Sequence, residues 1–507
     1  MRMRLPIEKP EQIHPKEGVP FLKYVSGEPH ERQGLILRTV PLRLGALNPP
    51  TPQLFMRWKN HPTRRDFLKT SALAGGTIFF PNLILGQAAK KVQFAGIGVE
   101  GKGKMDVAKA AEGAEIVALC DVDRTKLERA KLLYPNARTF ESFREMFESM
   151  GDKIDGVTVS TPDHTHYPAA MEALKHGKHV CVQKPLVNRI WEANELLAAA
   201  RKKKVLTNMG NQGHLLEGIR LLKEWLAAGA IGRVKEILVW TNRPIWPQGA
   251  RAADAMQPGT APETLNWEAW LAQCPSREYV PGLHPFAWRS HREYGAGAMG
   301  DMGCHLLDGP FWACGLGDPI SVEASAEDTT LTTFPAASTI ECHFKSANFG
   351  NVKLTWMDGG RKPERPSDLD PNMDWEKMKG GCIYRGEEGT LICPGDNSVN
   401  PRILNAERHA RWLAQKAPAP SIERATVTTP QLELVQAIEK NSACGANFEY
   451  SVPLTRLCLI GNVAALLPGK KLSWDAAAQQ FVNADDANAF LKRERTRTGW
   501  EYSAANL

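Results

Sequence analysis

Short apolar runs alternate with amphipathic stretches along residues 90–213 of the chain. In the amphipathic stretches the apolar residues recur every three or four positions, which is typical of helices, whereas the short apolar runs are typical of buried strands. The predicted strands are Val92–Gly96, Ile116–Cys120, Gly156–Ser160, His179–Gln183 and Val205–Met209. The predicted helices are Lys104–Glu112, Thr125–Leu133, Tyr167–His176 and Trp191–Lys203. This alternation predicts a parallel sheet with helices on both faces, a Rossmann-type α/β domain.

The pattern changes beyond residue 213, and a second domain is expected over residues 214–507. Several apolar runs bounded by turn residues predict a large, open, mostly antiparallel sheet. Its expected strands are Val234–Thr241, Ile320–Glu327, Ser338–Lys345, Asn351–Met357, Gly381–Arg385 and Gly389–Cys393. Helices are expected at Leu216–Ala228, Pro430–Lys440, Pro453–Leu467 and Ala484–Arg493. Residues 242–300, rich in Trp and Pro, predict irregular structure, and residues 359–380 predict an exposed loop.

The first 89 residues predict export rather than a folded domain. Residues 63–69 (TRRDFLK) form a twin-arginine motif, and a Gly-interrupted apolar run over residues 71–85 follows it. The run is too short for a stable membrane span, so residues 56–89 are interpreted as a cleaved signal that directs the protein to the periplasm. An amphipathic helix is the alternative. Residues 1–55 are Pro-rich and lack periodicity, which favours a disordered extension or a misassigned start, with Met56 as the initiator.

The basic charge of the chain belongs to this leader. Residues 1–89 hold 13 Lys and Arg against 6 Asp and Glu, so the remainder has 63−13 = 50 basic and 56−6 = 50 acidic residues. The mature part carries no sustained basic stripe. Nucleic acid is therefore not an expected partner.

A dinucleotide site is predicted where the first strand ends. Gly96, Gly98 and Gly101 follow the strand in G-x-G-x-x-G spacing, and Asp121 ends the next strand. The first glycine permits a tight turn, the second lets backbone approach a pyrophosphate, and the third packs the helix on the strand. Asp121 is placed to accept hydrogen bonds from the adenosine ribose. Its carboxylate favours NAD, although Arg124 nearby keeps NADP as the less favoured alternative.

Three polar segments are expected at the carboxyl ends of strands, where sheets of this type bind ligands, and a fourth lies in the second domain. Asp301 and His305 in the fourth segment are four residues apart, so a helical turn would point both the same way. The four segments are Thr161–His166, Gln183–Pro185, Gly210–His214 and Gly295–Asp308.

Together these motifs resemble the Gfo/Idh/MocA oxidoreductase family over nearly all of residues 90–505. The resemblance implies an active-site lysine at Lys184 and a Gly-rich turn followed by Asp-x-x-x-His at Asp301 and His305. It implies that Gly96, Gly98, Gly101 and Asp121 hold the nucleotide. It also implies that Thr161, Pro162 and His166 border the nicotinamide. Gln183 and Gln212 are likewise expected to bind the cofactor. The family's usual Glu before the lysine is Gln183 here, which is expected to alter the pKa of Lys184.

The chemistry of these residues suits the oxidation of a secondary alcohol. Such a reaction needs a base for the hydroxyl proton and a hydride acceptor about 3–3.5 Å from the carbon. His305 is the expected base, since imidazole titrates close to neutral pH. Lys184 is expected to donate to the reacting oxygen, and Asp301 to orient the substrate or the base. No metal is expected.

Aromatic and basic residues in the irregular part of the second domain are candidates for sugar binding, because sugar rings present apolar faces and many hydroxyls. Tryptophans in such stretches also commonly pin a loop to a core. The candidates are Trp240, Arg243, Trp246, Trp288 and Arg289.

These observations predict an NAD(P)-dependent oxidoreductase that acts on a hydroxyl of a sugar, polyol or glycoside. Export implies a tightly held nucleotide, since the periplasm is not expected to supply free NAD. A redox-neutral glycosidase or lyase that works through a keto-sugar is the alternative, and a non-catalytic sugar-binding protein is a third. A homo-oligomer, dimer or tetramer, is expected because an open sheet offers a broad face that needs covering.

Overall fold

The computed structural model describes residues 91–415, 418–482 and 484–507. The twin-arginine motif, the predicted signal over residues 56–89 and the extension over residues 1–55 lie outside the described residues.

The first half of the described chain is a six-stranded parallel sheet with helices between its strands. The strand order is β3-β2-β1-β4-β5-β6, so the order reverses between β1 and β4. A ligand crevice is expected at such a reversal, outside the carboxyl ends of the strands. The strands are β1 (Gln93–Ile97), β2 (Glu115–Cys120), β3 (Arg138–Phe140), β4 (Gly156–Val159), β5 (His179–Val182) and β6 (Thr207–Met209). The helices are α2 (Lys102–Ala111), α3 (Arg124–Leu133), α4 (Phe143–Met150), α5 (Asp163–Lys175) and α6 (Ile190–Lys203).

All five predicted strands and all four predicted helices of this half are present, and the predicted fold class is confirmed. Two elements were not predicted, β3 and α4. Strand β3 has three residues and lies at the sheet edge, so it has no apolar run to reveal it. Helix α4 buries Phe143, Met146, Phe147 and Met150 in a helical spacing that the sequence does contain.

The second half is built on a nine-stranded sheet. Its order is β15-β14-β13-β7-β12-β11-β10-β16-β17, and every pair is antiparallel except β7 with β12. The longer strands are β7 (Val234–Thr241), β10 (Ser321–Glu327), β11 (Ala337–Ser346), β12 (Gly350–Met357), β13 (Gly380–Gly386) and β14 (Thr390–Pro394). The short ones are β15 (Arg402–Ile403), β16 (Leu472–Asp475), β17 (Gln480–Phe481) and the separate pair β8 (Pro281–Gly282) and β9 (His284–Pro285).

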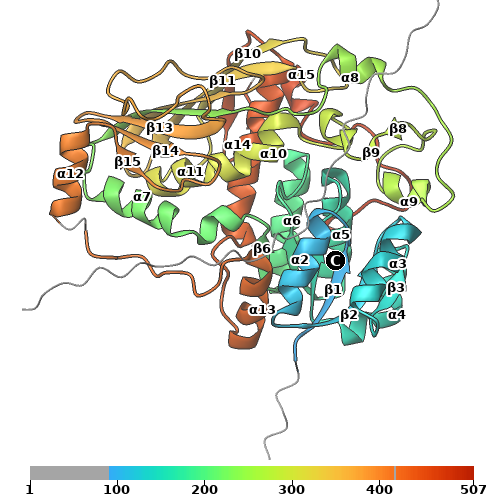
Figure 1. The fold of residues 1–507 in the computed structure, drawn as a ribbon. Coiled ribbons are helices and arrows are strands. Elements are labelled where there is room, and N and C mark those ends of the chain that lie inside the picture. Colours follow the sequence, from blue (N-terminus) through green and yellow to red (C-terminus); the bar gives the residue numbers. More distant parts are fainter. Residues whose placement is uncertain (1–90, 416–417, 483) are drawn as a thin grey trace, which may run out of the picture. The chain divides into compact units, whose positions relative to one another are not determined.

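Helices of the second half join the two sheets (Figure 1). Helix α14 packs against β10 and β11 and also against α6 and β6, while α13 lies on β5 and β6 of the first sheet. The helices are α7 (Glu217–Ala227), α8 (Ala250–Asp254), α9 (Trp267–Leu271), α10 (Gly297–Leu306), α11 (Asp308–Cys314), α12 (Ala406–Ala414), α13 (Pro430–Lys440), α14 (Phe448–Leu466) and α15 (Asp485–Asn488). The helix expected over 484–493 is shorter than predicted and ends at Asn488.

Residues 359–380 form the mostly exposed loop that was expected, apart from a few buried side chains and Gly380, which begins β13. Leu369 and Trp375 are buried and pack with Trp240 and Ile383 on the large sheet. The burial of Leu369 and Trp375 removes apolar surface from water. Because the neighbouring residues are polar, the sequence gives no sign of this burial.

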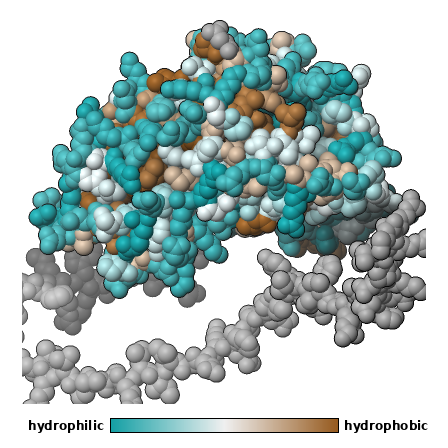
Figure 2. All heavy atoms as spheres, turned by 90° about the horizontal axis from the view of Figure 1, so that it is seen from above, coloured by the Kyte–Doolittle hydropathy of each residue, from teal (hydrophilic) through white to brown (hydrophobic). Residues whose placement is uncertain are grey.

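Part of the large sheet carries ion pairs on its outer side. Lys353 lies 2.8 Å from Glu236 and 3.4 Å from Glu341, and Arg385 lies 2.8 Å from Glu236. Figure 2 shows a face on which hydrophilic residues surround separate hydrophobic areas. This charged part does not support the argument that an apolar sheet face must be covered, so the oligomer stays a prediction. Among the described residues, no helix is long and apolar enough to cross a membrane.

Candidate active site

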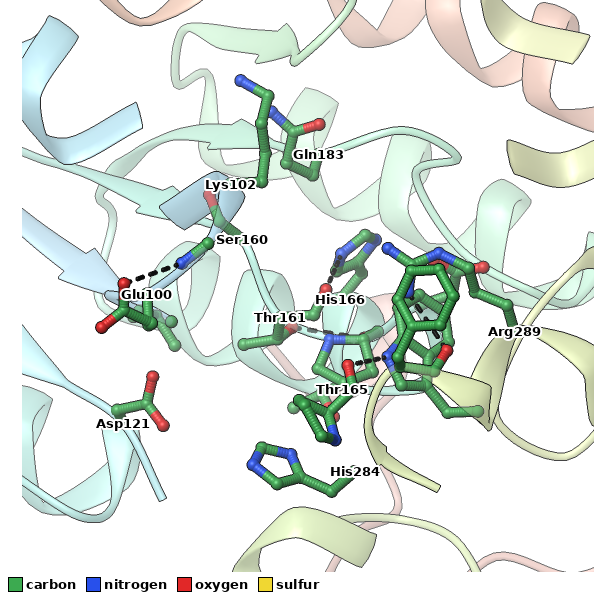
Figure 3. A pocket seen from close by; sticks show the side chains of 18 of the residues that line it. Glu100, Lys102, Asp121, Ser160, Thr161, Thr165, His166, Gln183, His284 and Arg289 are labelled. Carbon is green, nitrogen blue, oxygen red and sulfur yellow. Dashed lines mark hydrogen bonds between the residues drawn. The ribbon is translucent and has the colours of Figure 1, made fainter. Parts of the chain in front are cut away.

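A cavity of about 870 Å³ lies at the carboxyl ends of the Rossmann strands. Residues of the second half, among them Arg243, Trp288 and Asp301, form its other wall. In Figure 3, Asp121 and Glu100 lie at one side of this pocket and Arg289 at the opposite side. Most of the predicted site residues line it: Gly98, Gly101, Asp121, Thr161, Pro162, His166, Gln183, Lys184, Gln212, Arg243, Trp288, Arg289, Asp301 and His305.

The three glycines of the loop have different surroundings, and their roles differ in part from those expected. At Gly98 (φ +79°) a Cβ would lie 2.5 Å from the carbonyl oxygen of Ser160, and at Gly101 (φ +59°) it would meet nothing within 4 Å. Gly96 lies behind the cavity, where a Cβ would meet Val107 of α2. Close packing of helix on strand is thus the role of Gly96, and not of the third glycine, Gly101.

Asp121 is held in place by two backbone amides. The N–H of Val99 donates to its Oδ2 (3.0 Å) and the N–H of Asp123 donates to its Oδ1 (3.1 Å). Burial raises the pKa of the Asp121 carboxyl. Arg124, the residue that left NADP open, donates through its guanidinium to the carbonyl of Glu263 and does not line the cavity. This arrangement favours a ribose with a free 2′-hydroxyl.

His166 lies between the segment predicted to border the nicotinamide and the turn that carries Lys184. Its Nδ1 lies 2.8 Å from the carbonyl oxygen of Pro185, and its Nε2 lies 2.9 Å from that of Thr161. Burial lowers the pKa of His166 to about 4. The ring therefore fixes the turn after β4 against the turn that carries Lys184.

Lys184 and Asp301 form an ion pair between the two halves of the chain. Nζ of Lys184 lies 2.9 Å from Oδ1 of Asp301, and Arg243 and Arg289 lie within 4 Å of the same carboxylate. Burial acts to raise the pKa of Asp301, but the charges of Lys184 and Arg289 outweigh it, so the pKa is lowered overall. Asp301 is therefore ionised and surrounded by three cations.

His305 lies one turn after Asp301 on α10, as predicted. Its Nδ1 is 3.1 Å from Oδ1 of Asn211, whose own amide donates to the carbonyl of Cys304 (2.8 Å). This orientation of the amide places the proton on Nδ1 and leaves Nε2 as the acceptor. Burial and then the charge of Lys184 lower the pKa of His305 to about 3. The expectation that this imidazole titrates near neutrality is therefore wrong, because it rests on a solvated ring.

Gln183 has a carboxylate partner on another element. Its amide donates to Oδ2 of Asp106 (2.7 Å), a buried residue of α2 that also accepts from Ser160 (2.7 Å) and pairs with Lys102. A Glu at position 183 would bring two carboxylates together there. Lys184 still has a carboxylate partner, because it pairs with Asp301.

Two of the five residues expected to bind sugar lie outside the cavity wall. Trp240 is buried in the large sheet, 5.1 Å from the Trp375 ring, and Trp246 is buried behind Arg289. Each pins irregular chain to a core, which is the common role of such tryptophans. Arg289, in contrast, lies over the ring of Trp288 at 4.3 Å and lines the cavity.

Several cavity residues were not predicted, among them three polar ones, Asp163, Asp396 and Asn397. Asp163, the first residue of α5, is buried, and burial raises its pKa to about 7, with Asp301 adding to the shift against Arg289 and Lys184. Asp163 lies inside the predicted segment Thr161–His166, so its carboxylate at a strand end was a signal present in the sequence. Asp396 and Asn397 come from a loop after β14. The run Pro394–Ser398 (PGDNS) predicts a turn there, but nothing in it indicates a ligand site. No group of three or more His, Cys, Asp or Glu within the described residues could hold a metal ion.

Fold and site together define an NAD-binding oxidoreductase built from a Rossmann domain and a large open sheet. Residues 90–211 match the oxidoreductase family described as "NAD-binding Rossmann fold", and residues 268–385 match the Gfo/Idh/MocA C-terminal domain. Both matched stretches, one in each sheet-containing part of the chain, are domains of the Gfo/Idh/MocA oxidoreductase family.

Individual relatives are more distant. A levoglucosan dehydrogenase of Pseudarthrobacter phenanthrenivorans is 25% identical over 46% of this chain and 48% of its own length. A glycosyl hydrolase family 109 protein of Solibacter usitatus is 34% identical over 27% of this chain and 35% of its own. Two other curated relatives are matched over 32% and 66% of their own length. Among solved structures, the WlbA dehydrogenase of Bordetella pertussis in complex with NADH and UDP-GlcNAcA is similar to this chain. The similarity covers 76% of this chain and 99% of that protein, with a TM-score of 0.52 and 16% identity, and it shows a shared fold.

Proposed function

We propose that this chain is an NAD-dependent oxidoreductase that acts on a hydroxyl of a sugar, polyol or glycoside. The observation that carries the proposal is the group formed by Lys184, Asp301 and His305, which lines one cavity with the glycine loop and Asp121. The levoglucosan dehydrogenase and the UDP-GlcNAcA complex among its relatives support a carbohydrate substrate.

The residues divide the chemistry among them. When NAD is bound, it supplies the hydride acceptor. Lys184 is placed to donate to the reacting oxygen, where it would stabilise developing negative charge. His305 is neutral over the physiological pH range, so its Nε2 can accept the hydroxyl proton, and the charge of Asp301 would stabilise the imidazolium that forms. Asp301 holds Lys184 in place.

The proposal includes a tightly held nucleotide and export by the twin-arginine pathway. Residues 63–69 support export, and export supports retention because the periplasm is not expected to supply free NAD. The test is to express the protein with its leader, purify it folded, denature it and identify any released nucleotide by mass spectrometry. Stoichiometric NAD is the expected result. A protein that arrives empty and fails to bind added NAD would overturn the proposal.

One observation favours a second candidate, a redox-neutral glycosidase or lyase. An elimination next to a keto group needs a further base for the carbon-bound proton, and Asp163 offers a buried carboxyl with a pKa of about 7 in the same cavity. The relative in glycosyl hydrolase family 109 points the same way. Glycoside cleavage without net NADH would favour this candidate, and steady NADH production would exclude it.

A further inference from the structure

The C-terminal segment, residues 495–507, returns to the Rossmann domain and forms part of the cavity wall. Figure 1 marks the end of the chain beside this domain. Within the segment, Trp500 lines the cavity next to Phe143 of α4, and the two rings meet edge to face with their centroids 5.9 Å apart. Two aromatic side chains therefore border the cavity at this point.

This aromatic pair belongs to the adenosine end of the cavity. Phe143 follows β3, the strand next to the β2 strand that ends just before Asp121. In the order β3-β2-β1-β4-β5-β6, strands β2 and β3 lie on one side of the reversal between β1 and β4. Strand β5, which Lys184 follows, lies on the other side. With the ribose at Asp121, an adenine ring would extend toward Phe143 and Trp500.

Arg144 ties the segment to α4. Its guanidinium lies 3.9 Å from the centroid of the Trp500 ring, Nη2 donates to the carbonyl of Gly499 (2.7 Å), and Nε donates to the hydroxyl of Tyr502 (2.9 Å). The Tyr502 hydroxyl donates in turn to Glu172 of α5 (2.7 Å). Arg144 itself is not part of the cavity lining.

Arg497 ties the same segment to the opposite wall. Its guanidinium donates to the carboxylate (2.6 Å) and to the carbonyl oxygen (2.8 Å) of Glu268 on α9, and it lies 5.3 Å from the centroid of the Trp500 ring. Helix α9 contributes Ala269 and Trp270 to the cavity. The indole of Trp500 is therefore held by two arginines, and the segment connects α4 with α9.

We propose that Trp500 and Phe143 form the adenine subsite and that the C-terminal segment must release its anchors before the dinucleotide can leave. An adenine ring is flat and presents a π-face to aromatic side chains, so it can pack against the side of these two rings that borders the cavity. The inference rests on the proposed function, because it explains how the nucleotide is retained.

The test measures the rate at which bound NAD exchanges. Protein purified with its nucleotide is mixed with an excess of isotopically labelled NAD, and the retained label is followed by mass spectrometry. Trp500→Ala removes the subsite and Arg144→Ala removes the anchor outside the cavity. Each is expected to speed exchange about tenfold or more, on the scale of one base–aromatic contact. Trp412→Ala on α12, outside the cavity lining, is the matched control and should exchange at the wild-type rate.

The outcomes separate the two proposals. Wild-type protein that holds no NAD would overturn the tightly held nucleotide of the proposed function. Wild-type protein that holds NAD while both variants exchange at its rate would overturn the role of the segment alone. If Trp500→Ala does not fold, judged by circular dichroism, Tyr502→Phe decides. This variant keeps the ring and removes the bonds to Arg144 and Glu172, so it should also exchange faster.

Discussion

Lys184 and Asp301, 117 residues apart in the chain, are joined by two hydrogen bonds from one ammonium group, to the carboxylate (2.9 Å) and to the backbone carbonyl (2.6 Å) of the aspartate. The lysine follows a strand of the Rossmann sheet, and the aspartate stands on α10 beneath the large sheet. The pair forms only when the two halves of the chain are docked, so the proposed catalytic group depends on their interface.

Replacing Lys184 by Met should lower turnover about 100-fold or more, the scale of losing one donor to a developing oxyanion, while bound NAD is retained. Turnover of a sugar panel and nucleotide content together check this. Lys470→Met, which breaks an exposed pair with Asp486, is the control and should leave both unchanged. Unchanged turnover in Lys184→Met would favour a non-catalytic or differently built site.

Asp163 should make the stability of the nucleotide-free protein depend on pH. Its pKa is about 7 in the folded chain and about 4 when unfolded, so the stability that it contributes is present below pH 4 and is lost as the pH rises through 7. Asp163→Asn should therefore be more stable than the wild type at pH 8, by up to about 4 kcal/mol, with little difference at pH 4. Urea unfolding at both pH values measures this. An equal difference at the two pH values would show that the carboxyl does not titrate in this range.

The amide of Gln183 and the carboxylate of Asp106 should be able to exchange positions. Gln183→Glu alone places two carboxylates in contact and should destabilise the fold by about 2 kcal/mol or more, because one charge is left uncompensated. Adding Asp106→Asn should recover most of the loss. Denaturant unfolding of the wild type, both single variants and the double variant forms a double-mutant cycle, and additive effects would contradict the contact.

Asp121 should set the choice of nucleotide. Asp121→Ser removes the carboxylate that repels a 2′-phosphate and should raise the affinity for NADP about tenfold or more. Arg124→Ala should leave the preference for NAD unchanged, because that guanidinium is engaged with Glu263. Calorimetric titration of nucleotide-free protein with both dinucleotides tests the pair. A wild type that binds NADP as tightly as NAD would refute this role.

Most of the fold could be predicted because its signals are local. Strand β7 has the predicted bounds Val234–Thr241, and α13 has the predicted bounds Pro430–Lys440. Such elements carry an apolar pattern or a boundary residue within themselves. Strand β3 and the buried residues of 359–380 owe their structure to contacts with distant chain, which no local pattern encodes.

The candidate site divides in the same way. The glycine loop and the pair Asp301 and His305 depend on spacing within one segment, so they could be predicted. The low pKa of His305 could not, because it arises from burial and from Lys184, which is distant in sequence. Trp240 was misplaced because one tryptophan on a strand looks the same whether it faces a ligand or a packed loop.

Asp106 connects the helix after the glycine loop to the residue before Lys184. It belongs to the helix that follows the glycine loop, and it holds Gln183, the neighbour of Lys184. A shift of that helix as a pyrophosphate settles at its first turn would pull directly on the backbone beside the lysine. Through the hydrogen bond between Gln183 and Asp106, the helix at which a pyrophosphate would bind is connected to the residue directly before Lys184, so substitutions in that helix should be felt at the lysine.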